Sequence, residues 1–194
     1  MALDQELEIG DDALLQLYAN GDQSAARLLT VRLAPRAYAQ AYRMLGSAAD
    51  AEDVAQEAMM RVWKIAPEWR TGEAKVTTWL YRVTANLCTD RLRKTRATSL
   101  DAIDEPVDES PSALDVLQQD ARMDALQGAL LEPPERQRQA VVLRHIDELP
   151  NPEIAEVMQI SVEAVESLTS RGKRALAGLL RGRKAALGYE GDTE

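Results

Sequence analysis

The chain lacks most of the residues on which disulfide, metal and histidine chemistry depend. Its 194 residues include one cysteine, Cys88, one histidine, His145, and no phenylalanine. A single cysteine cannot form an internal disulfide, and the sequence has no Cys/His spacing typical of a zinc site. A catalytic site would also need a nucleophile, a base or a metal partner, and a lone histidine such as His145 is more often a surface or packing residue. The sequence therefore predicts no metal, no cofactor and no enzyme.

Long apolar runs are also missing. No stretch approaches the roughly 18 consecutive apolar residues of a transmembrane helix, so we expect no membrane insertion. The opening segment "MALDQELEIGDD" has neither the basic region nor the apolar run of a signal peptide. These two absences predict a cytoplasmic protein.

Acidic residues outnumber basic ones, but they are unevenly distributed. The net charge is −9, which at first argues against a nucleic-acid partner. Residues 99–124 hold eight acidic side chains and one basic, and residues 188–194 hold three acidic and none basic. The two remaining blocks, 1–98 and 125–187, are nearly neutral, so local basic patches can still bind phosphates.

The apolar residues recur at helical spacing, and no alternating strand pattern is evident, which predicts an all-α fold. The length and the 45% hydrophobic content allow two small helical domains. Between them, "TSLDAIDEPVDESPSALD" has the composition of a flexible acidic linker. The predicted organisation is an N-terminal domain at 1–98, the linker at 99–112, a C-terminal domain at 113–187 and an acidic tail at 188–194.

Helix start and stop signals divide these domains further. In the "DAEDVAQEAMMRVWK" helix Asp50 is the expected N-cap, and Pro35 is a possible kink in the helix before it. The first domain is expected to contain helices near 11–20, 22–46, 50–65 and 76–96. The second is expected to contain one at 113–131, one opened by Pro133-Pro134, and a final pair at 151–158 and 161–186.

The final pair has the pattern of a helix-turn-helix. Apolar residues lie at Ile154 and Met158, a small residue at Ala155 suits a close crossing, and Ser161 can cap the second helix. An ordinary helical hairpin is the alternative. The run from 167 to 187 favours the first interpretation, because it contains six cations and no acid, as a phosphate-binding surface would. These cations are Arg171, Lys173, Arg174, Arg181, Arg183 and Lys184.

A second basic patch ends the helix that begins "TTWLYRVT". Arg91, Arg93, Lys94 and Arg96 follow the aromatic pair Trp79 and Tyr81. Aromatic rings that stack on unpaired bases and cations that hold the backbone would together suit single-stranded nucleic acid. The spacing of Trp79 with the aliphatic residues after it is equally typical of core packing.

The helix "DAEDVAQEAMMRVWK" separates into two faces. Val54, Ala58, Val62 and Ile65 form an apolar stripe. The opposite face holds Asp53, Gln56, Glu57, Met60, Arg61 and Lys64. Because catalytic partners are missing, this face is either a docking surface for another protein or simply solvated.

These three segments and the acidic linker, in this order and spacing, resemble a bacterial RNA polymerase sigma factor of the extracytoplasmic-function type, in the sigma-70 family. The resemblance extends from about Leu14 to Leu180. It implies an alternative sigma factor that binds core RNA polymerase, through the β′ clamp helices and the β subunit, and directs it to promoter DNA in duplex and single-stranded form. An anti-sigma factor is a further expected partner.

The resemblance also assigns roles to residues. Polymerase contacts are implied at Asp53, Gln56, Glu57, Met60 and Arg61. Capture and melting of the −10 element are implied for Arg70, Lys75, Thr77, Trp79, Tyr81, Arg82, Asn86, Arg91, Arg93 and Lys94. Binding of the −35 element as duplex is implied for Ser161, Val162, Glu163, Glu166, Ser167, Ser170, Arg171, Lys173 and Arg174.

Four positions depart from the family pattern. Val76 replaces a frequent aromatic, Gln159 a glycine of the turn, and Glu163 and Glu166 replace neutral or basic residues. Glutamate can accept a hydrogen bond from cytosine N4, but it also repels phosphate. Two alternative functions are a sigma mimic that sequesters an anti-sigma factor and a stand-alone helix-turn-helix regulator. The basic patches disfavour the first, and the acidic docking helix disfavours the second.

Overall fold

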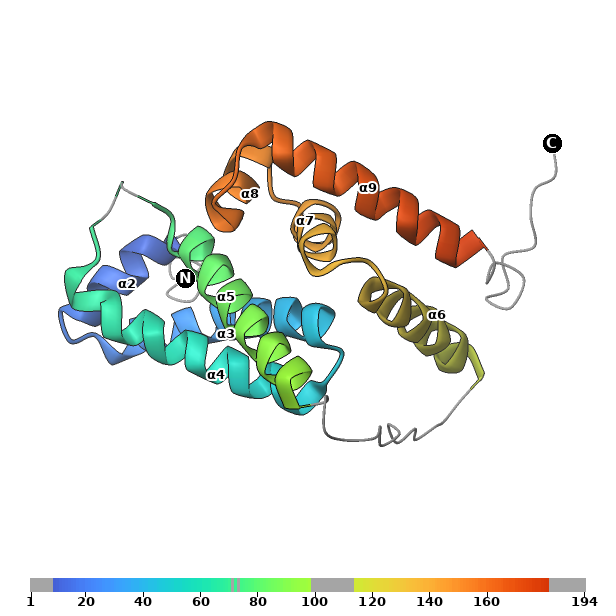
Figure 1. Ribbon diagram of the computed structural model, residues 1–194. Coiled ribbons are helices and arrows are strands. Elements are labelled where there is room, and N and C mark those ends of the chain that lie inside the picture. The colour runs from blue at the N-terminus through green and yellow to red at the C-terminus, as the bar shows by residue number, and fades with distance from the viewer. Residues whose placement is uncertain (1–8, 71, 73, 99–113, 182–194) are drawn as a thin grey trace. The chain divides into compact units, whose positions relative to one another are not determined.

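The computed structural model describes residues 9–70, 72, 74–98 and 114–181, and all the regular elements in these ranges are helices (Figure 1). The all-α prediction is confirmed. None of the described helices combines the length and the apolar composition that crossing a bilayer requires. The chain divides into two compact units, with the main division between Cys88 and Thr89. The predicted linker lies outside the described residues, so the domain boundaries at 98 and 113 stay a prediction.

The first unit is a small helical bundle. Its elements are α2 (Asp11–Ala19), α3 (Gln23–Leu45), α4 (Ala48–Ile65), the 3-10 helix η1 (Ala66–Glu68) and α5 (Val76–Thr98), whose residues from Thr89 onward fall beyond the division. Helix α3 continues through Pro35, which lies inside it. A buried glutamine, Gln40, links α3 to α5 by donating from Nε2 to the carbonyl oxygen of Tyr81 at 3.2 Å.

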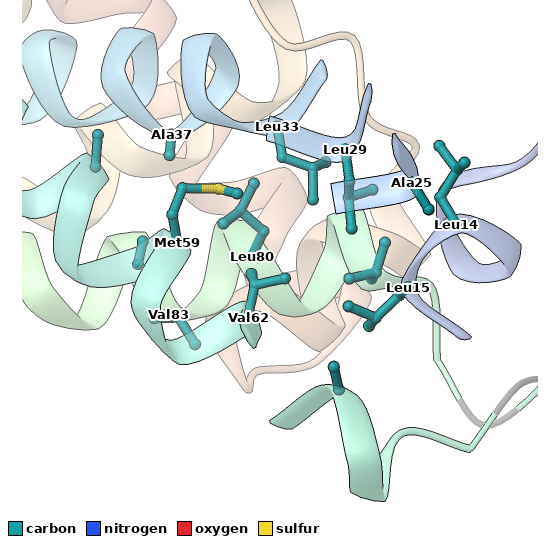
Figure 2. Close-up of a cluster of buried hydrophobic side chains, with 14 residues drawn as sticks. Leu14, Leu15, Ala25, Leu29, Leu33, Ala37, Met59, Val62, Leu80 and Val83 are labelled. Carbon is teal, nitrogen blue, oxygen red and sulfur yellow. The ribbon is translucent and has the colours of Figure 1, made fainter. Parts of the chain in front are cut away.

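Aliphatic side chains from all of these elements form one core (Figure 2). Leu15 of α2, Leu33 of α3, Val62 of α4 and Leu80 of α5 are completely buried. Within each of the longer helices the buried apolar residues are mostly three or four positions apart, the spacing that puts them on one face of the helix. The burial fixes which face of each helix is left for contacts with other molecules.

Side chains and one glycine set the helix ends in this unit. The Asp22 carboxylate accepts from the amides of Ser24 and Ala25 and so caps α3, which ends at Gly46 in the left-handed conformation. Ser47 caps α4, because its hydroxyl accepts from the Asp50 amide at 3.2 Å. The prediction of Asp50 as the N-cap is therefore wrong by one turn, since Asp50 lies inside the helix, in its first turn.

The second unit contains α6 (Leu114–Leu131), α7 (Glu135–His145), α8 (Asn151–Met158) and α9 (Val162–Arg181). Helices α6, α7 and α9 share a core that includes Leu130, Val142 and Leu176. Helices α8 and α9, joined by a three-residue turn, have the predicted helix-turn-helix order. In the turn Gln159 has φ of 52°, a conformation that costs a non-glycine residue free energy and explains why glycine suits this position.

One glycine brings α9 close to α7. A Cβ built on Gly172 would lie 2.6 Å from Val141 Cγ2 and 2.9 Å from the carbonyl oxygen of Gln137. No side chain larger than hydrogen fits there without a shift of the α7 backbone. Helices α7 and α9 can therefore approach this closely only because position 172 has no side chain.

Candidate functional site

The exposed face of α4 is the first candidate surface. Asp53, Gln56 and Arg61 are exposed, and Met60 is 52% exposed, which is high for an apolar side chain in a helix. The opposite face, at Ala51, Val54, Ala58 and Val62, is buried. The core thus presents the predicted docking residues together on one side of a rigid helix.

Within this face, charges pair locally. Glu57 and Arg61 form an ion pair at 2.8 Å, one helical turn apart, with both side chains about half exposed. An exposed pair of this kind stabilises the helix by only ~0.3–0.5 kcal/mol. A partner can therefore separate Glu57 from Arg61 at little cost and pair with either of them.

The start of α5 is the second candidate surface, and it is held by a residue that the sequence analysis missed. Asp12 of α2 accepts two hydrogen bonds at Oδ1, from the indole nitrogen of Trp69 at 3.2 Å and from the amide of Val76 at 3.0 Å. Adjacent acids before an apolar run indicate the first turn of a helix. That signal points to α2 itself and gives no hint of partners 57 and 64 residues away.

Two tryptophans meet beside this carboxylate. The rings of Trp69 and Trp79 pack edge to face with centroids 6.2 Å apart, and both side chains are half-buried. Trp79 therefore fits both roles considered for it, core packing and base stacking, since it contacts another ring and still has exposed surface. Tyr81 is only 6% exposed, so the expectation that its ring stacks on a base is wrong for this structure. The buried Gln40 of α3 donates to the backbone carbonyl oxygen of Tyr81, so this turn of α5 lies against α3.

Beyond the tryptophans, one side of α5 carries the predicted DNA contacts. Trp79, Arg82, Asn86 and Arg93 recur at intervals of three, four and seven residues, and none of them is buried. Arg93 forms a weak, exposed pair with Asp90 at 3.5 Å. The other predicted residues differ in exposure: Arg70, Lys75 and Lys94 are exposed, and Thr77 and Arg91 are half-buried.

The N-terminal half of α9 is the third candidate surface. Ser161 caps the helix, as predicted, by accepting from the Ala164 amide at 3.3 Å. Glu163 is exposed, and hydrogen bonds from its own amide and from the Ser161 side chain hold the pKa of its carboxyl below the ordinary value. Glu166 accepts from Asn151 of α8 at 3.4 Å. Glu163 thus stays ionised at neutral pH, and Glu166 is held in place by a hydrogen bond from α8.

Further along, the cations of α9 lie on its exposed side. Arg171 donates to the Ser167 hydroxyl at 2.6 Å, and Arg174 Nε donates to the carbonyl oxygen of Ser170 at 3.4 Å. Lys173 and Ser170 are exposed as well, whereas Val162 and Ser167 are half-buried. Val165, Gly172 and Leu176 face the core. The predicted residues therefore form a mixed surface, acidic near the turn and basic further along; Arg183 and Lys184 lie outside the described residues.

Nothing in the described ranges assembles a reactive centre. His145 is exposed at the end of α7, and partial burial and the positive charges of Lys173 and Arg144 lower its pKa. In this part of the chain no cluster of three or more His, Cys, Asp or Glu side chains could hold a metal ion. The three surfaces are therefore suited to binding.

Comparisons with known proteins agree on one family. Residues 29–98 match the family model for sigma-70 region 2, and residues 123–176 match that for sigma-70 region 4. The chain is 35% identical over 174 residues to the extracytoplasmic-function (ECF) sigma factor SigW of Bacillus subtilis, covering 83% of this chain and 91% of SigW. It is 30% identical over 181 residues to the sigma-E factor of Escherichia coli, covering 87% and 93%.

Solved structures give the same picture of the fold. CnrH, in complex with the cytosolic domain of CnrY, matches with a TM-score of 0.66 and 28% identity, over 89% of this chain and 97% of CnrH. The sigma factor RpoE of Bartonella quintana, in complex with the anti-sigma factor NepR, matches with a TM-score of 0.66 and 21% identity, over 80% and 96%. At that identity the second likeness supports the fold alone.

Proposed function

The chain belongs to the extracytoplasmic-function sigma factors of the sigma-70 family and is an alternative sigma factor in transcription initiation, and we propose that its three exposed surfaces divide the work of that function. The observation that carries the proposal is their construction. On each of α4, α5 and α9 a buried apolar face supports an exposed polar face that contains the residues predicted for contact.

In this proposal α4 binds core RNA polymerase. Asp53, Gln56 and Arg61 supply polar contacts, and Met60 supplies an apolar centre. Interfaces commonly place an apolar side chain among polar neighbours that exclude water. Contact with the clamp helices of the β′ subunit would use this face of α4, with the Glu57–Arg61 pair free to rearrange.

Helix α5 acts on the −10 element. Trp79 offers its exposed ring surface to an unpaired base, and Arg82 and Asn86 continue the same side of the helix. Cations at Arg91, Arg93 and Lys94 bind the backbone of the opened strand, because phosphate contacts position DNA without reading its sequence. Tyr81 is removed from this set, because its burial makes it a core residue.

Helix α9 binds the −35 element as duplex DNA. Its N-terminal residues would enter the major groove, as in other helix-turn-helix proteins, while Arg171, Lys173 and Arg174 contact phosphates. Asn151 holds Glu166 at the end that would face the bases. A glutamate presented in this way favours cytosine, through its N4 donor, and disfavours bases that present only acceptors.

The chain itself would catalyse no reaction. An anti-sigma factor is proposed as a regulator, because two of the solved relatives, CnrH and RpoE, were crystallised with partner proteins, in one case named as an anti-sigma factor. A sigma mimic would need no DNA contacts, and the exposed cations of α5 and α9 argue against it.

Run-off transcription with purified bacterial core polymerase tests the proposal. Promoters would be selected from genomic fragments bound by the reconstituted holoenzyme, and transcription from them should depend on this chain. Core binding without any transcription would instead favour a decoy, and promoter binding without core binding would favour a stand-alone regulator.

A further inference from the structure

The carboxylate of Asp12 contacts both ends of the segment that leads into α5. Trp69, at the end of η1, donates its indole N–H to Oδ1, and Val76, the first residue of α5, donates its backbone amide to the same oxygen. Six residues separate these donors in sequence. A single oxygen atom of α2 therefore holds the Trp69 indole nitrogen and the Val76 amide close to each other.

Each of the two bonds gives a partner to an N–H group whose burial without a hydrogen bond would cost free energy. The first amides of a helix have no partner within it, and an acid at this end also interacts favourably with the helix dipole. The residue before α5 is Lys75, and a lysine side chain, which only donates hydrogen bonds, cannot accept one from an amide of α5. The indole N–H of a half-buried tryptophan likewise needs a partner. Asp12 serves both needs, although it lies on a different helix.

Asp12 is itself held in place through its neighbour. Asp11 forms ion pairs with Arg32 at 3.0 Å and with Arg36 at 3.6 Å, and Arg32 also donates to the carbonyl oxygen of Ile9 at 2.6 Å. These contacts join the start of α2 to the middle of α3. A continuous series of polar contacts thus runs from α3 through α2 to the start of α5.

We propose that Asp12 is a positioning residue for recognition of the −10 element. By holding Val76 and Trp69, it sets the first turn of α5 and the ring of Trp69 against which Trp79 packs. Trp79 then presents its free surface in one orientation. A recognition group held by such a supporting contact binds with less loss of conformational freedom. The inference rests on the proposed role of α5 and adds a residue that makes no DNA contact itself.

The test compares Asp12→Ala, Asp12→Asn and the control Glu68→Ala in the full chain bound to core polymerase. Glu68 is an exposed carboxylate one residue before Trp69, so its removal changes the local charge equally. On duplex promoter Asp12→Ala should reduce open-complex formation about five- to tenfold, the size of effect expected when one helix cap is lost. Asparagine keeps the acceptor oxygen and should lie within about twofold of the unsubstituted chain.

A template that is already melted separates positioning from general damage. There Asp12→Ala should recover in part, because the bases no longer have to be unpaired before Trp79 can bind them. Its affinity for core polymerase should change less than about twofold, because none of the residues predicted to contact polymerase takes part in the two bonds of Asp12. An Asn variant as defective as Ala, or normal opening by Asp12→Ala, would each overturn the proposal.

Two further measurements keep the result interpretable. Trp69→Phe keeps an aromatic ring but removes the indole donor and part of the ring area, so it should reproduce part of the opening defect even if Asp12→Ala folds poorly. Amide exchange at Val76 in the free protein should accelerate in Asp12→Ala and not in Asp12→Asn. If the unsubstituted chain drives no transcription, the proposed function fails, while unchanged exchange at Val76 is the result that rejects the positioning role.

Discussion

The two units hold their recognition helices in different ways. In the first, α5 depends on contacts across long stretches of sequence, from Asp12 to Val76 and from Gln40 to Tyr81. In the second, the side-chain bonds along α9 are mostly within one turn, such as Ser167 to Arg171. The proposed DNA-binding surface of the first unit is therefore a product of tertiary structure, and that proposed for the second is mainly a product of helix periodicity.

This difference predicts how damage spreads. A defect in the core of the first unit should disturb α4 and α5 together, because both use the same buried cluster (Figure 2). In the second unit, an exposed residue of α9 can change without disturbing its neighbours. The most vulnerable point of the second unit is the crossing of α7 and α9 at Gly172.

The largest effect is expected on polymerase binding. The double variant Asp53→Lys and Gln56→Ala should weaken core binding at least ~100-fold, about 3 kcal/mol, if the exposed face of α4 is the centre of the interface. Both residues are exposed and the opposite face is buried, so the melting temperature should change little. Core binding would be measured by competition with another sigma factor. Glu132→Lys, at an exposed carboxylate between α6 and α7 and so outside α4, is the charge-reversal control, and binding equal to that control would contradict the docking role.

Gly172→Ala should produce the next largest effect, confined to the second unit. The new methyl group would clash with the α7 backbone at the carbonyl of Gln137, and we expect a loss of about 1–3 kcal/mol of unfolding free energy. Gly178→Ala in the same helix meets no atom within 4 Å and should stabilise by ~0.5–1 kcal/mol. Denaturant unfolding monitored by circular dichroism distinguishes them; two variants of equal stability would show that the crossing tolerates a side chain.

Alanine at Arg91 and Arg93 should impair promoter opening by about tenfold, since each contact to phosphate contributes modestly and is screened by salt. Core binding should be retained, because these residues lie on α5. A premelted template should restore part of the activity, as measured by permanganate reactivity of the opened strand. An identical loss on both templates would mean that the cations hold DNA and do not assist melting.

Replacing Gln159 by glycine should give a small gain in stability. The residue has φ of 52°, and a left-handed conformation costs a non-glycine residue roughly 1 kcal/mol or more. Glycine removes this strain but loses more entropy on folding, so the net gain should be only a few tenths of a kcal/mol. A lower melting temperature in Gln159→Gly would show that the glutamine side chain makes a compensating contact.

The smallest effect concerns acid pH, and it compares a carboxylate at the start of one helix in each unit, Asp22 at α3 and Glu163 at α9. Hydrogen bonds from the Ser24 side chain and amide lower the pKa of Asp22, and those from the Glu163 amide and Ser161 lower that of Glu163. A lowered pKa adds stability that is present at neutral pH and lost as pH falls below about 4. Asp22→Asn, which still caps, and Glu163→Gln should each reduce the drop in melting temperature between neutral pH and pH ~3. If both variants lose as much melting temperature at acid pH as the unsubstituted chain, these carboxylates do not contribute to its acid sensitivity.

Periodicity made much of this protein predictable. The exposed residues of α4, the cap at Ser161 and the buried side of α9 follow from spacings of three and four residues and from the preference of serine for helix starts. The error at Asp50 has a local origin too, since Ser47 and Asp50 are both residues that cap helices and only the backbone geometry selects Ser47.

The sequence by itself determined the all-α class, the order of the helices, the helix-turn-helix and the family, because these depend on local preferences and ordered motifs. Tertiary structure alone decided three features of the recognition surfaces. It buried Tyr81, it made Gly172 the crossing point of α7 and α9, and it brought Asp12 to Val76. These features depend on which helices meet in three dimensions, and a periodic pattern specifies that a face is buried without specifying its partner.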